Sequence, residues 1–320
     1  GLEIIMIIDR IYLSMEGYIE KMVKELTEMG MVISKREAST PMNKPINVDG
    51  DSPSLTPKQT RLLLTAHGCV GWCAHTTRID ASHGFSRTGQ HSANPTEDSL
   101  EAVTHMVNYL WYNKDLCLYQ SRYIEDTNFG DTPENYNLLD DQLGFRVYCD
   151  TDHAGNAEIQ NKRRSQNGHV LMHGEAVVDY YSKASSVGFA TPLIGEAHAD
   201  MNTGAVEVYG TANATLETLN TAYMYEELGI PFPFPFELLV DNTTAKAFCD
   251  ETVKRSKLKY IDCRQEWCKM IRNKKICKVI HCKTKINNSD ILTKILAPGE
   301  FIGLRNKMMI SHPRPMKRMD

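Results

Sequence analysis

Residues 145–181, with the sequence FRVYCDTDHAGNAEIQNKRRSQNGHVLMHGEAVVDYY, contain three short runs that are typical of β-strands. The runs are 145–149, 168–172 and 177–181, and apolar residues dominate each of them. Segments that are charged or contain glycine separate the runs. Such runs and turns predict three consecutive antiparallel strands.

The elements after these strands alternate between helix and strand. Helical periodicity predicts helices over 203–228 and 258–271, and short apolar runs predict strands over 236–240 and 277–281. A last helix is expected over 289–296. Three strands followed by this alternation predict an α/β domain on a mixed five-stranded sheet.

The residues before position 123 predict a smaller, mostly helical segment. Apolar residues at helical spacing indicate a helix over 9–30, and a cap signal at 94–96 indicates a second helix over 96–112. Residues 31–60 have no sustained period, so we expect a long loop there.

The domain boundaries follow from composition. Six carboxylates with several asparagines and glycines fill 123–144, which we expect to be a linker. The expected domains are therefore 1–122 and 145–300, followed by a basic C-terminal tail over 301–320.

Composition excludes several classes of protein. With 42% hydrophobic and 24% charged residues, the 320-residue chain is neither disordered nor collagen-like. No apolar run reaches the roughly 18 residues of a membrane span, and Glu3, Asp9 and Arg10 interrupt any signal peptide. We therefore expect an intracellular protein, cytoplasmic or nuclear, without a membrane partner. Because the chain begins at Gly1 and not at methionine, we expect a piece of a longer translation product.

Nine cysteines are an odd number in a chain of this length, which favours free thiols. A zinc site is the alternative, although the spacing is loose and no Cys-x-x-Cys occurs. Its candidate ligands are Cys263, Cys268, Cys277, His281 and Cys282.

The net charge of −4 is unevenly distributed. Residues 251–320 hold 18 lysines and arginines against 6 acidic residues, a net charge of +12, so residues 1–250 carry −16. This basic part is either a solvated lysine-rich face or a surface for a polyanion. For a nucleic acid, the candidate contacts with backbone phosphates are Lys254, Arg255, Lys257, Lys259, Lys274 and Lys275.

Four carboxylates stand where predicted strands end or helices begin. Asp150 follows the first strand, Asp241 follows the fourth, and Asp290 opens the last helix. Glu207 lies one turn into the helix over 203–228 and joins them if that helix packs across the sheet. Converging acids repel one another unless a cation neutralises them, and their hard oxygen ligands suit Mg²⁺. The set predicts a pair of Mg²⁺ ions for phosphodiester cleavage, although each acid alone is also explained as a capping or surface carboxylate.

Eight segments together resemble the ribonuclease H domain of copia-type retrotransposon polyproteins. In chain order they are VYCDTDHAG (147–155), RRSQNGHVLMHG (163–174), YYSK (180–183), VEVYG (206–210), EELGI (226–230), LLVDNTTA (238–245), LKYIDCRQEW (258–267) and NSDILTKIL (288–296). Upstream segments are similar to the part that joins reverse transcriptase to this domain in the same family, namely GCVGW (68–72), TRID (77–80), NPT (94–96) and VNYL (107–110). The helix around Tyr18 resembles the end of the polymerase itself.

The resemblance implies a ribonuclease H-like fold that hydrolyses the RNA strand of RNA–DNA hybrids during reverse transcription. It implies two Mg²⁺ ions, for which Mn²⁺ is an expected substitute, held by the catalytic residues Asp150, Glu207, Asp241 and Asp290. Glu196 is the second choice for the glutamate, because 184–202 resemble an insertion relative to the family. The expected partners are the hybrid and the rest of the polyprotein, including its reverse transcriptase. Without a Tyr-x-Asp-Asp turn, the fragment is not expected to make DNA.

Other interpretations stay open. The chain could be a nucleic-acid-binding remnant that has lost its metal chemistry, or a purely structural part of a polyprotein. Asp150 and Asp152 also resemble the opening of haloacid-dehalogenase-type phosphatases, although that class needs a later lysine and acidic pair without a convincing match here.

Overall fold

The structure is a computed structural model of the chain, and it divides into two compact units. It describes residues 1–7, 10–46, 52–121, 144–156, 164–185, 189–190, 197–198, 203–243, 246 and 259–312. Unit 1 comprises Gly1–Asn43, Pro53–Tyr123 and Pro298–Asp320, and unit 2 comprises Lys44–Ser52 and Ile124–Ala297. The linker expected over 123–144 lies outside the described residues, except for Gly144.

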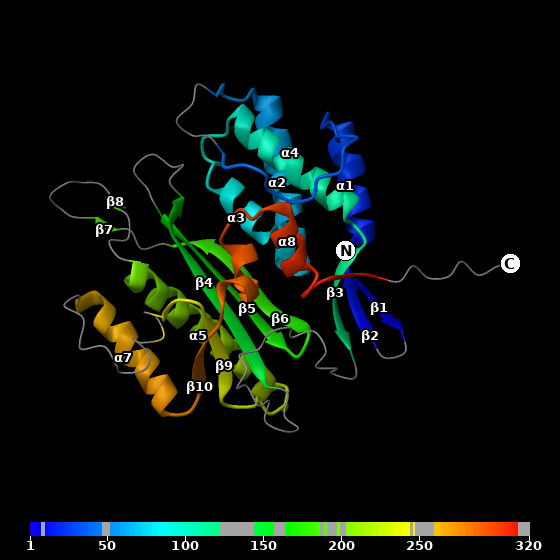
Figure 1. The fold of residues 1–320 in the computed structure, drawn as a ribbon. Coiled ribbons are helices and arrows are strands. Elements are labelled where there is room, and N and C mark those ends of the chain that lie inside the picture. Colours follow the sequence, from blue (N-terminus) through cyan, green and yellow to red (C-terminus); the bar gives the residue numbers. More distant parts are fainter. Residues whose placement is uncertain are drawn as a thin grey trace. The chain divides into compact units, whose positions relative to one another are not determined.

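Unit 2 is built on a mixed five-stranded sheet with the order β10-β9-β4-β5-β6 (Figure 1). The strands are β4 (Phe145–Asn156), β5 (Arg164–His173), β6 (Ala176–Ala184), β9 (Phe236–Val240) and β10 (Cys277–His281). β4, β5 and β6 pair antiparallel, whereas β9 pairs parallel with both β4 and β10. The predicted α/β fold, with three antiparallel strands followed by strands that alternate with helices, is confirmed.

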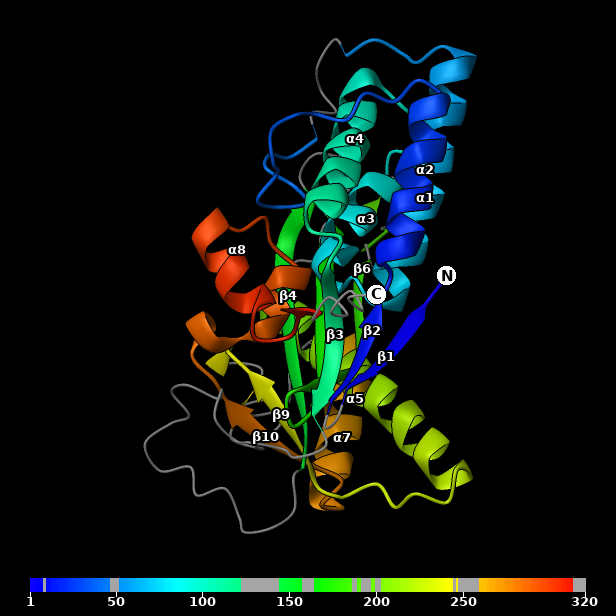
Figure 2. The same ribbon diagram turned by 90° about the vertical axis from the view of Figure 1, so that its right-hand side faces the viewer.

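Helical elements pack on both faces of this sheet. The long helix α5 (Thr203–Glu227) lies on one face together with α7 (Lys259–Asn273), and the 3-10 helix η3 (Asn288–Leu292) lies on the other (Figure 2). On β5, Leu171 packs in a cluster with Ala214 of α5, while Gly168 faces Leu292 of η3. Successive side chains of a strand point to opposite faces, so these two contacts place the helices on opposite sides.

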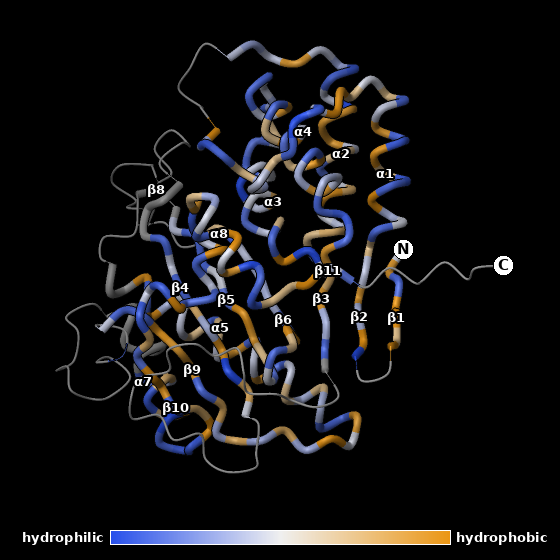
Figure 3. Tube along the Cα trace, turned by 45° about the vertical axis from the view of Figure 1, so that its right-hand side comes forward, coloured by the Kyte–Doolittle hydropathy of each residue, from blue (hydrophilic) through white to orange (hydrophobic). Residues whose placement is uncertain are grey.

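The core of unit 2 follows the period of two that the sequence shows. Alternate residues of β4 and β9 face α5, and the hydrophobic colour of β9 is visible in Figure 3. The buried cluster comprises Phe145, Val147, Cys149, Leu171, Ala214, Phe236, Leu238, Val240, Ile271 and Cys277. The intervening residues of β4, which are Arg146, Tyr148 and Asp150, point to the opposite face of the sheet.

Unit 1 contains the predicted helical segment and, in addition, a small sheet. Its helical elements are α1 (Glu16–Glu28), α2 (Pro57–Thr76), η1 (Ile79–Ala81), α3 (Ser82–Gly89), α4 (Glu97–Tyr112) and α8 (Pro298–Arg305). The sheet has the order β1-β2-β3-β11, made from Glu3–Ile7, Arg10–Ser14, Leu116–Ser121 and Ile310–Ser311. None of the helices formed by described residues has the length and apolar character needed to span a membrane.

The helix predicted over 9–30 is wrong at its N-terminal end, before Glu16. Residues 10–14 form β2, which pairs antiparallel with both β1 and β3, and the helix α1 begins only at Glu16. The predicted apolar face does exist, since Ile19 and Met22 are among the buried residues of α1. Helical spacing alone missed the strand because strand pairing depends on residues distant in sequence.

The loop predicted over 31–60 is too long at its C-terminal end. Pro57 begins α2, and Thr56 and Gln59 form a capping box that satisfies two backbone N–H groups. The predicted helix over 96–112 is confirmed as α4, which also begins with a capping box, formed by Thr96 and Ser99.

Two C-terminal elements also differ from expectation. The helix predicted over 289–296 is the shorter η3, whose N-terminus is capped by the Asn287 side chain and which ends before Thr293. The expected tail from residue 301 begins within α8, and β11 then pairs with β3. The apparent insertion over 184–202 contains a pair of two-residue strands, β7 (Phe189–Ala190) and β8 (Ala197–His198).

Unit 1 also buries a complete ion pair. The Arg78 guanidinium donates from Nε to Oδ1 of Asp80 at 3.0 Å and from Nη2 to Oδ2 at 2.7 Å, and both side chains are fully buried. The Tyr109 hydroxyl donates to the same Oδ2 at 2.6 Å. Burial alone would raise the pKa of Asp80, but the paired guanidinium and the hydrogen bonds leave it lowered. The pair is therefore a charged part of the core, and each charge depends on the other.

Candidate active site

Two aspartates stand side by side because their strands are parallel neighbours. Cys149 of β4 pairs with Val240 of β9, so Asp150 and Asp241 each follow a paired residue. The strand predicted over 145–149 is too short, because β4 continues to Asn156; Asp150 therefore lies within it and is only 3% exposed. Asp241 is half-buried just beyond the end of β9, as predicted. This register brings two carboxylates to one place on the sheet.

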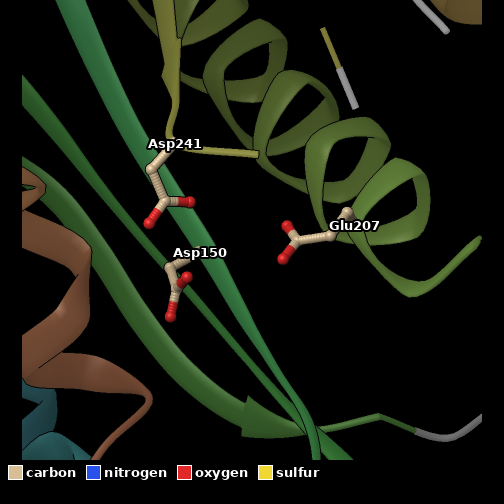
Figure 4. Close-up of side chains that lie close together, drawn as sticks. All are labelled: Asp150, Glu207 and Asp241. Carbon is tan, nitrogen blue, oxygen red and sulfur yellow. The ribbon is translucent and has the colours of Figure 1, made fainter. Parts of the chain in front are cut away.

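The third carboxylate comes from α5. A Cβ atom at Gly210 would overlap Oγ1 of Thr151, so the helix approaches β4 more closely there than any other residue would allow. Glu207 lies about one turn earlier on the same helix. One carboxylate oxygen each from Asp150, Glu207 and Asp241 lies within 4.8 Å of the others, and Figure 4 shows the three side chains turned toward one another.

The fourth predicted acid reaches the cluster from the other face. Gly168 is paired with Asp150, and a Cβ there would lie 2.7 Å from Cβ of Leu292. The missing side chain lets η3 pack directly over the sheet beside Asp150. Asp290, the third residue of η3, is thereby buried next to the cluster.

A lysine links this acid to the others. Nζ of Lys294 lies 2.9 Å from Oδ1 of Asp290 and 3.2 Å from Oδ2 of Asp150. The Thr293 hydroxyl also donates a hydrogen bond to Oδ2 of Asp150. Asp290 is thus not one of the three carboxylates that lie within 4.8 Å of one another, but Lys294 connects it to Asp150.

The carboxylates raise one another's affinity for protons. Burial, and then the charges of Asp150 and Asp241, raise the pKa of Glu207 to about 8. Burial, and then the charge of Asp150, raise the pKa of Asp290 to about 6. Burial also raises the pKa of Asp150, despite Lys294 and Thr293. A cation bound among these acids would favour their ionised form, which burial and mutual repulsion disfavour. Carboxylate oxygens are the ligands that Mg²⁺ and Mn²⁺ prefer. The residues therefore fit a hard divalent ion.

The structure thus places all four predicted acids in one region. Glu196, the second choice for the glutamate, lies outside the described residues. Sequence reasoning missed Thr293, Lys294, Gly168 and Gly210. Two of these residues had a signal in the sequence. Lys294 follows Asp290 at the i, i+4 spacing of a predicted helix, and Gly210 is a glycine inside another predicted helix.

The predicted nucleic-acid contacts are only partly described. Lys274 and Lys275 are exposed in the turn after α7, and α7 begins at Lys259, whose side chain is not described. Lys254, Arg255 and Lys257 lie outside the described residues. The basic surface therefore stays a prediction.

Two alternative sites find no support among the described side chains. The described cysteines, which include Cys268, Cys277 and Cys282, form no disulfide bond. Among the described residues, the group of three potential metal ligands is that of Asp150, Glu207 and Asp241, and it contains no cysteine or histidine. Asp152, the second aspartate of the phosphatase interpretation, is paired with Gln166 inside β4 and is not part of the acid cluster.

Replacing Gly210 with alanine is expected to slow the phosphodiester hydrolysis that the sequence predicts by about 10-fold or more. The added methyl group pushes α5 away from Thr151 and with it the Glu207 carboxylate, and small misplacements of reacting groups are costly. A loss of about 1–3 kcal/mol in the free energy of unfolding should accompany it. Rates and thermal unfolding would be measured beside Gly303→Ala, a helical position with nothing within 4 Å of the added Cβ. Wild-type behaviour of the Gly210 variant would refute the role of close packing.

The raised pKa of Glu207, about 8, predicts a pH-dependent loss of stability without metal. Because the folded state holds the proton more tightly, the stabilisation is complete below the unfolded pKa near 4.5 and is lost as pH rises through 8. In EDTA, Glu207→Gln should therefore match the wild type at pH 4.5 and unfold at a temperature several degrees higher at pH 8.5. Differential scanning calorimetry measures both. A variant less stable than the wild type at pH 8.5 would contradict the prediction.

The chain is similar over most of its length to retrovirus-related Pol polyproteins of plant transposons. It is 24% identical over 293 residues to that of transposon RE2 from Arabidopsis thaliana, which covers 87% of this chain and 18% of the relative. It is 21% identical over 297 residues to the polyprotein of transposon TNT 1-94 from Nicotiana tabacum, a match that covers 91% of this chain and 20% of the relative. The resemblance to copia-type polyproteins is thereby confirmed, and the chain spans about a fifth of the length of these relatives. No family model matches the chain.

Solved structures similar to this chain include two RNase H1 proteins. That from the halophilic archaeon Halobacterium salinarum NRC-1 has a TM-score of 0.31 and 15% identity, covering 47% of this chain and 93% of that one. LC11-RNase H1 in complex with an RNA/DNA hybrid has a TM-score of 0.30 and 15% identity, with the same coverage. The order and directions of the strands described above carry the fold assignment themselves.

Proposed function

We propose that unit 2 is a ribonuclease H, an endonuclease that hydrolyses the RNA strand of RNA–DNA hybrids as part of a retrotransposon polyprotein. The observation that carries the proposal is the convergence of Asp150, Glu207 and Asp241 from β4, α5 and β9. The similarity to retrovirus-related Pol polyproteins supports the same biological setting. Reverse transcription produces the hybrid, which is therefore the proposed substrate.

The four acids would hold the divalent ions. Asp150, Glu207, Asp241 and Asp290 supply only carboxylate oxygens, which suit Mg²⁺ with Mn²⁺ as substitute. When bound, two such ions activate a water molecule and stabilise the leaving oxygen of the phosphodiester. Two neighbouring residues position one of these acids, because Thr293 and Lys294 both contact the Asp150 carboxylate and fix its orientation. The burial of Asp150 and Glu207 removes bulk water and strengthens every charge interaction in the cluster.

Binding of the hybrid would be largely independent of base sequence. The lysines and arginines of the basic part over 251–320, including Lys274 and Lys275 after α7, are suited to contacts with backbone phosphates. Hybrid affinity should accordingly fall steeply with salt concentration.

Cleavage of labelled nucleic acid tests the proposal. The full chain would be incubated with an RNA–DNA hybrid, with matched duplex RNA and with the single strands, each in Mg²⁺ and in EDTA. Cleavage of the RNA strand of the hybrid alone, and only with metal, is the expected result. Cleavage that persists in EDTA or spares the hybrid while cutting duplex RNA would reject the ribonuclease H assignment.

The alternative is a nucleic-acid-binding remnant without metal chemistry. The ammonium of Lys294 inside the cluster favours it, since this charge already neutralises part of the site. A chain that binds the hybrid in Mg²⁺ and in Mn²⁺ but leaves it intact in both would support the remnant.

A further inference from the structure

Lys294 divides the carboxylate cluster into two sides that differ in charge. On one side, Asp150, Glu207 and Asp241 bring their oxygens within 4.8 Å of one another. On the other side, Nζ of Lys294 bridges Asp150 at 3.2 Å and Asp290 at 2.9 Å. Asp150 belongs to both sides. Among the described residues, the printed ion pairs of the cluster are those of Lys294 with Asp150 and Asp290, so the side formed by Glu207 and Asp241 is the less neutralised one.

An ammonium in this place opposes a metal ion beside it. A cation bound between Asp150 and Asp290 would lie within a few ångströms of Nζ, where like charges in a partly buried site repel by several kcal/mol. No such repulsion acts at the same strength on the side formed by Glu207 and Asp241. The first divalent ion should therefore bind on that side.

The ammonium of Lys294 is nevertheless able to move away from Asp150 and Asp290. Its side chain is 32% exposed and follows the end of η3, while the carboxylate of Asp150 is 3% exposed. Lysine carries its charge on a flexible stem of four carbons, so other anions can draw the ammonium away. A phosphate of an arriving nucleic acid is an anion of this kind.

We propose that Lys294 is a built-in cation that occupies the Asp150–Asp290 side, so that the protein without nucleic acid binds one divalent ion and takes a second only when Lys294 moves away. The inference rests on the proposed metal chemistry of the same acids and adds the order in which the two sides are filled. Lys294 is thereby a positioning residue, which acts on the ions through charge.

Metal-binding stoichiometry tests this directly. The full chain without nucleic acid would be titrated with Mn²⁺ by isothermal calorimetry, with the number of bound ions checked by electron paramagnetic resonance. The wild type should bind one ion. Lys294→Met should bind two, or bind the second at least about 10-fold more tightly, because the competing charge is gone. Lys294→Arg keeps the charge and should behave as the wild type, whereas Lys294→Met with Asp290→Asn should return to one ion.

The outcomes separate the inference from the proposed function. Two ions bound to the wild type, or one ion bound with unchanged affinity to Lys294→Met, would overturn the inference and leave the metal site in place. No binding to either protein at millimolar Mn²⁺ would overturn both. Without Lys294, the carboxylates of Asp150 and Asp290 repel each other, and the variant could lose stability for that reason alone. The thermal unfolding of each protein would therefore be measured in EDTA and in Mn²⁺ as well. Mn²⁺ should raise the midpoint of Lys294→Met by more degrees than that of the wild type, and an equal rise would count against the inference.

Discussion

Replacing Asp241 with asparagine is expected to lower the rate of hybrid cleavage by about 10³-fold or more while hybrid affinity changes by no more than about twofold. The amide keeps the size of the carboxylate but removes the charge that holds a divalent ion, and an ion of this kind is worth several kcal/mol to the transition state. Phosphate contacts, which supply most of the affinity, are not altered. Rates would be measured under single-turnover conditions and affinities by fluorescence anisotropy in Ca²⁺.

Asp241 suits this test better than Asp150. Asp241 is half-buried beyond the end of β9, whereas Asp150 is buried and receives the hydrogen bond from Thr293 and the charge of Lys294. Loss of Asp150 would therefore disturb packing as well as metal binding. Glu226→Gln, which removes one charge from an exposed position on α5, is the control and should cleave as the wild type. Cleavage by the Asp241 variant within 10-fold of the wild type would remove this residue from the proposed site.

Replacing Arg78 with methionine is expected to destabilise unit 1 by about 3–5 kcal/mol. The change leaves the fully buried Asp80 without its guanidinium partner, and breaking a buried pair in this way is costly. At typical enthalpies this lowers the unfolding midpoint of the unit by about 10 °C or more. Hydrogen exchange of α2 and α4, read by mass spectrometry, would locate the loss in unit 1.

A double replacement separates the lost pair from a simple loss of packing. Arg78→Met with Asp80→Leu removes both buried charges, so it should be more stable than Arg78→Met alone. Tyr109 then lacks its acceptor, which limits the recovery. If the double variant is as unstable as the single one, the cost comes from packing and not from the stranded carboxylate.

The sequence predicted the sheet of unit 2 better than the sheet of unit 1. In 145–181 the three strands are consecutive and alternate in polarity, so local pattern and topology agree. In unit 1, β2 pairs with β3 more than a hundred residues away, and β3 pairs with β11 near the other end of the described chain. Periodicity within a short segment carries no information about such distant pairs, and for this reason the spacing over 9–30 predicts a helix where β2 forms.

The same division applies to the candidate site. Order and periodicity along the chain placed Asp241 at the end of β9, because a strand end is a local feature of the sequence. Asp150 lies inside β4, which continues to Asn156, and the parallel pairing of β4 with β9 is what brings the two aspartates together. Only the tertiary structure brought Glu207 to them, through the close approach of α5 at Gly210, and set Lys294 between Asp150 and Asp290. Those arrangements depend on packing distances of a few ångströms between elements far apart in sequence, and hydrophobic periodicity carries no information about such distances.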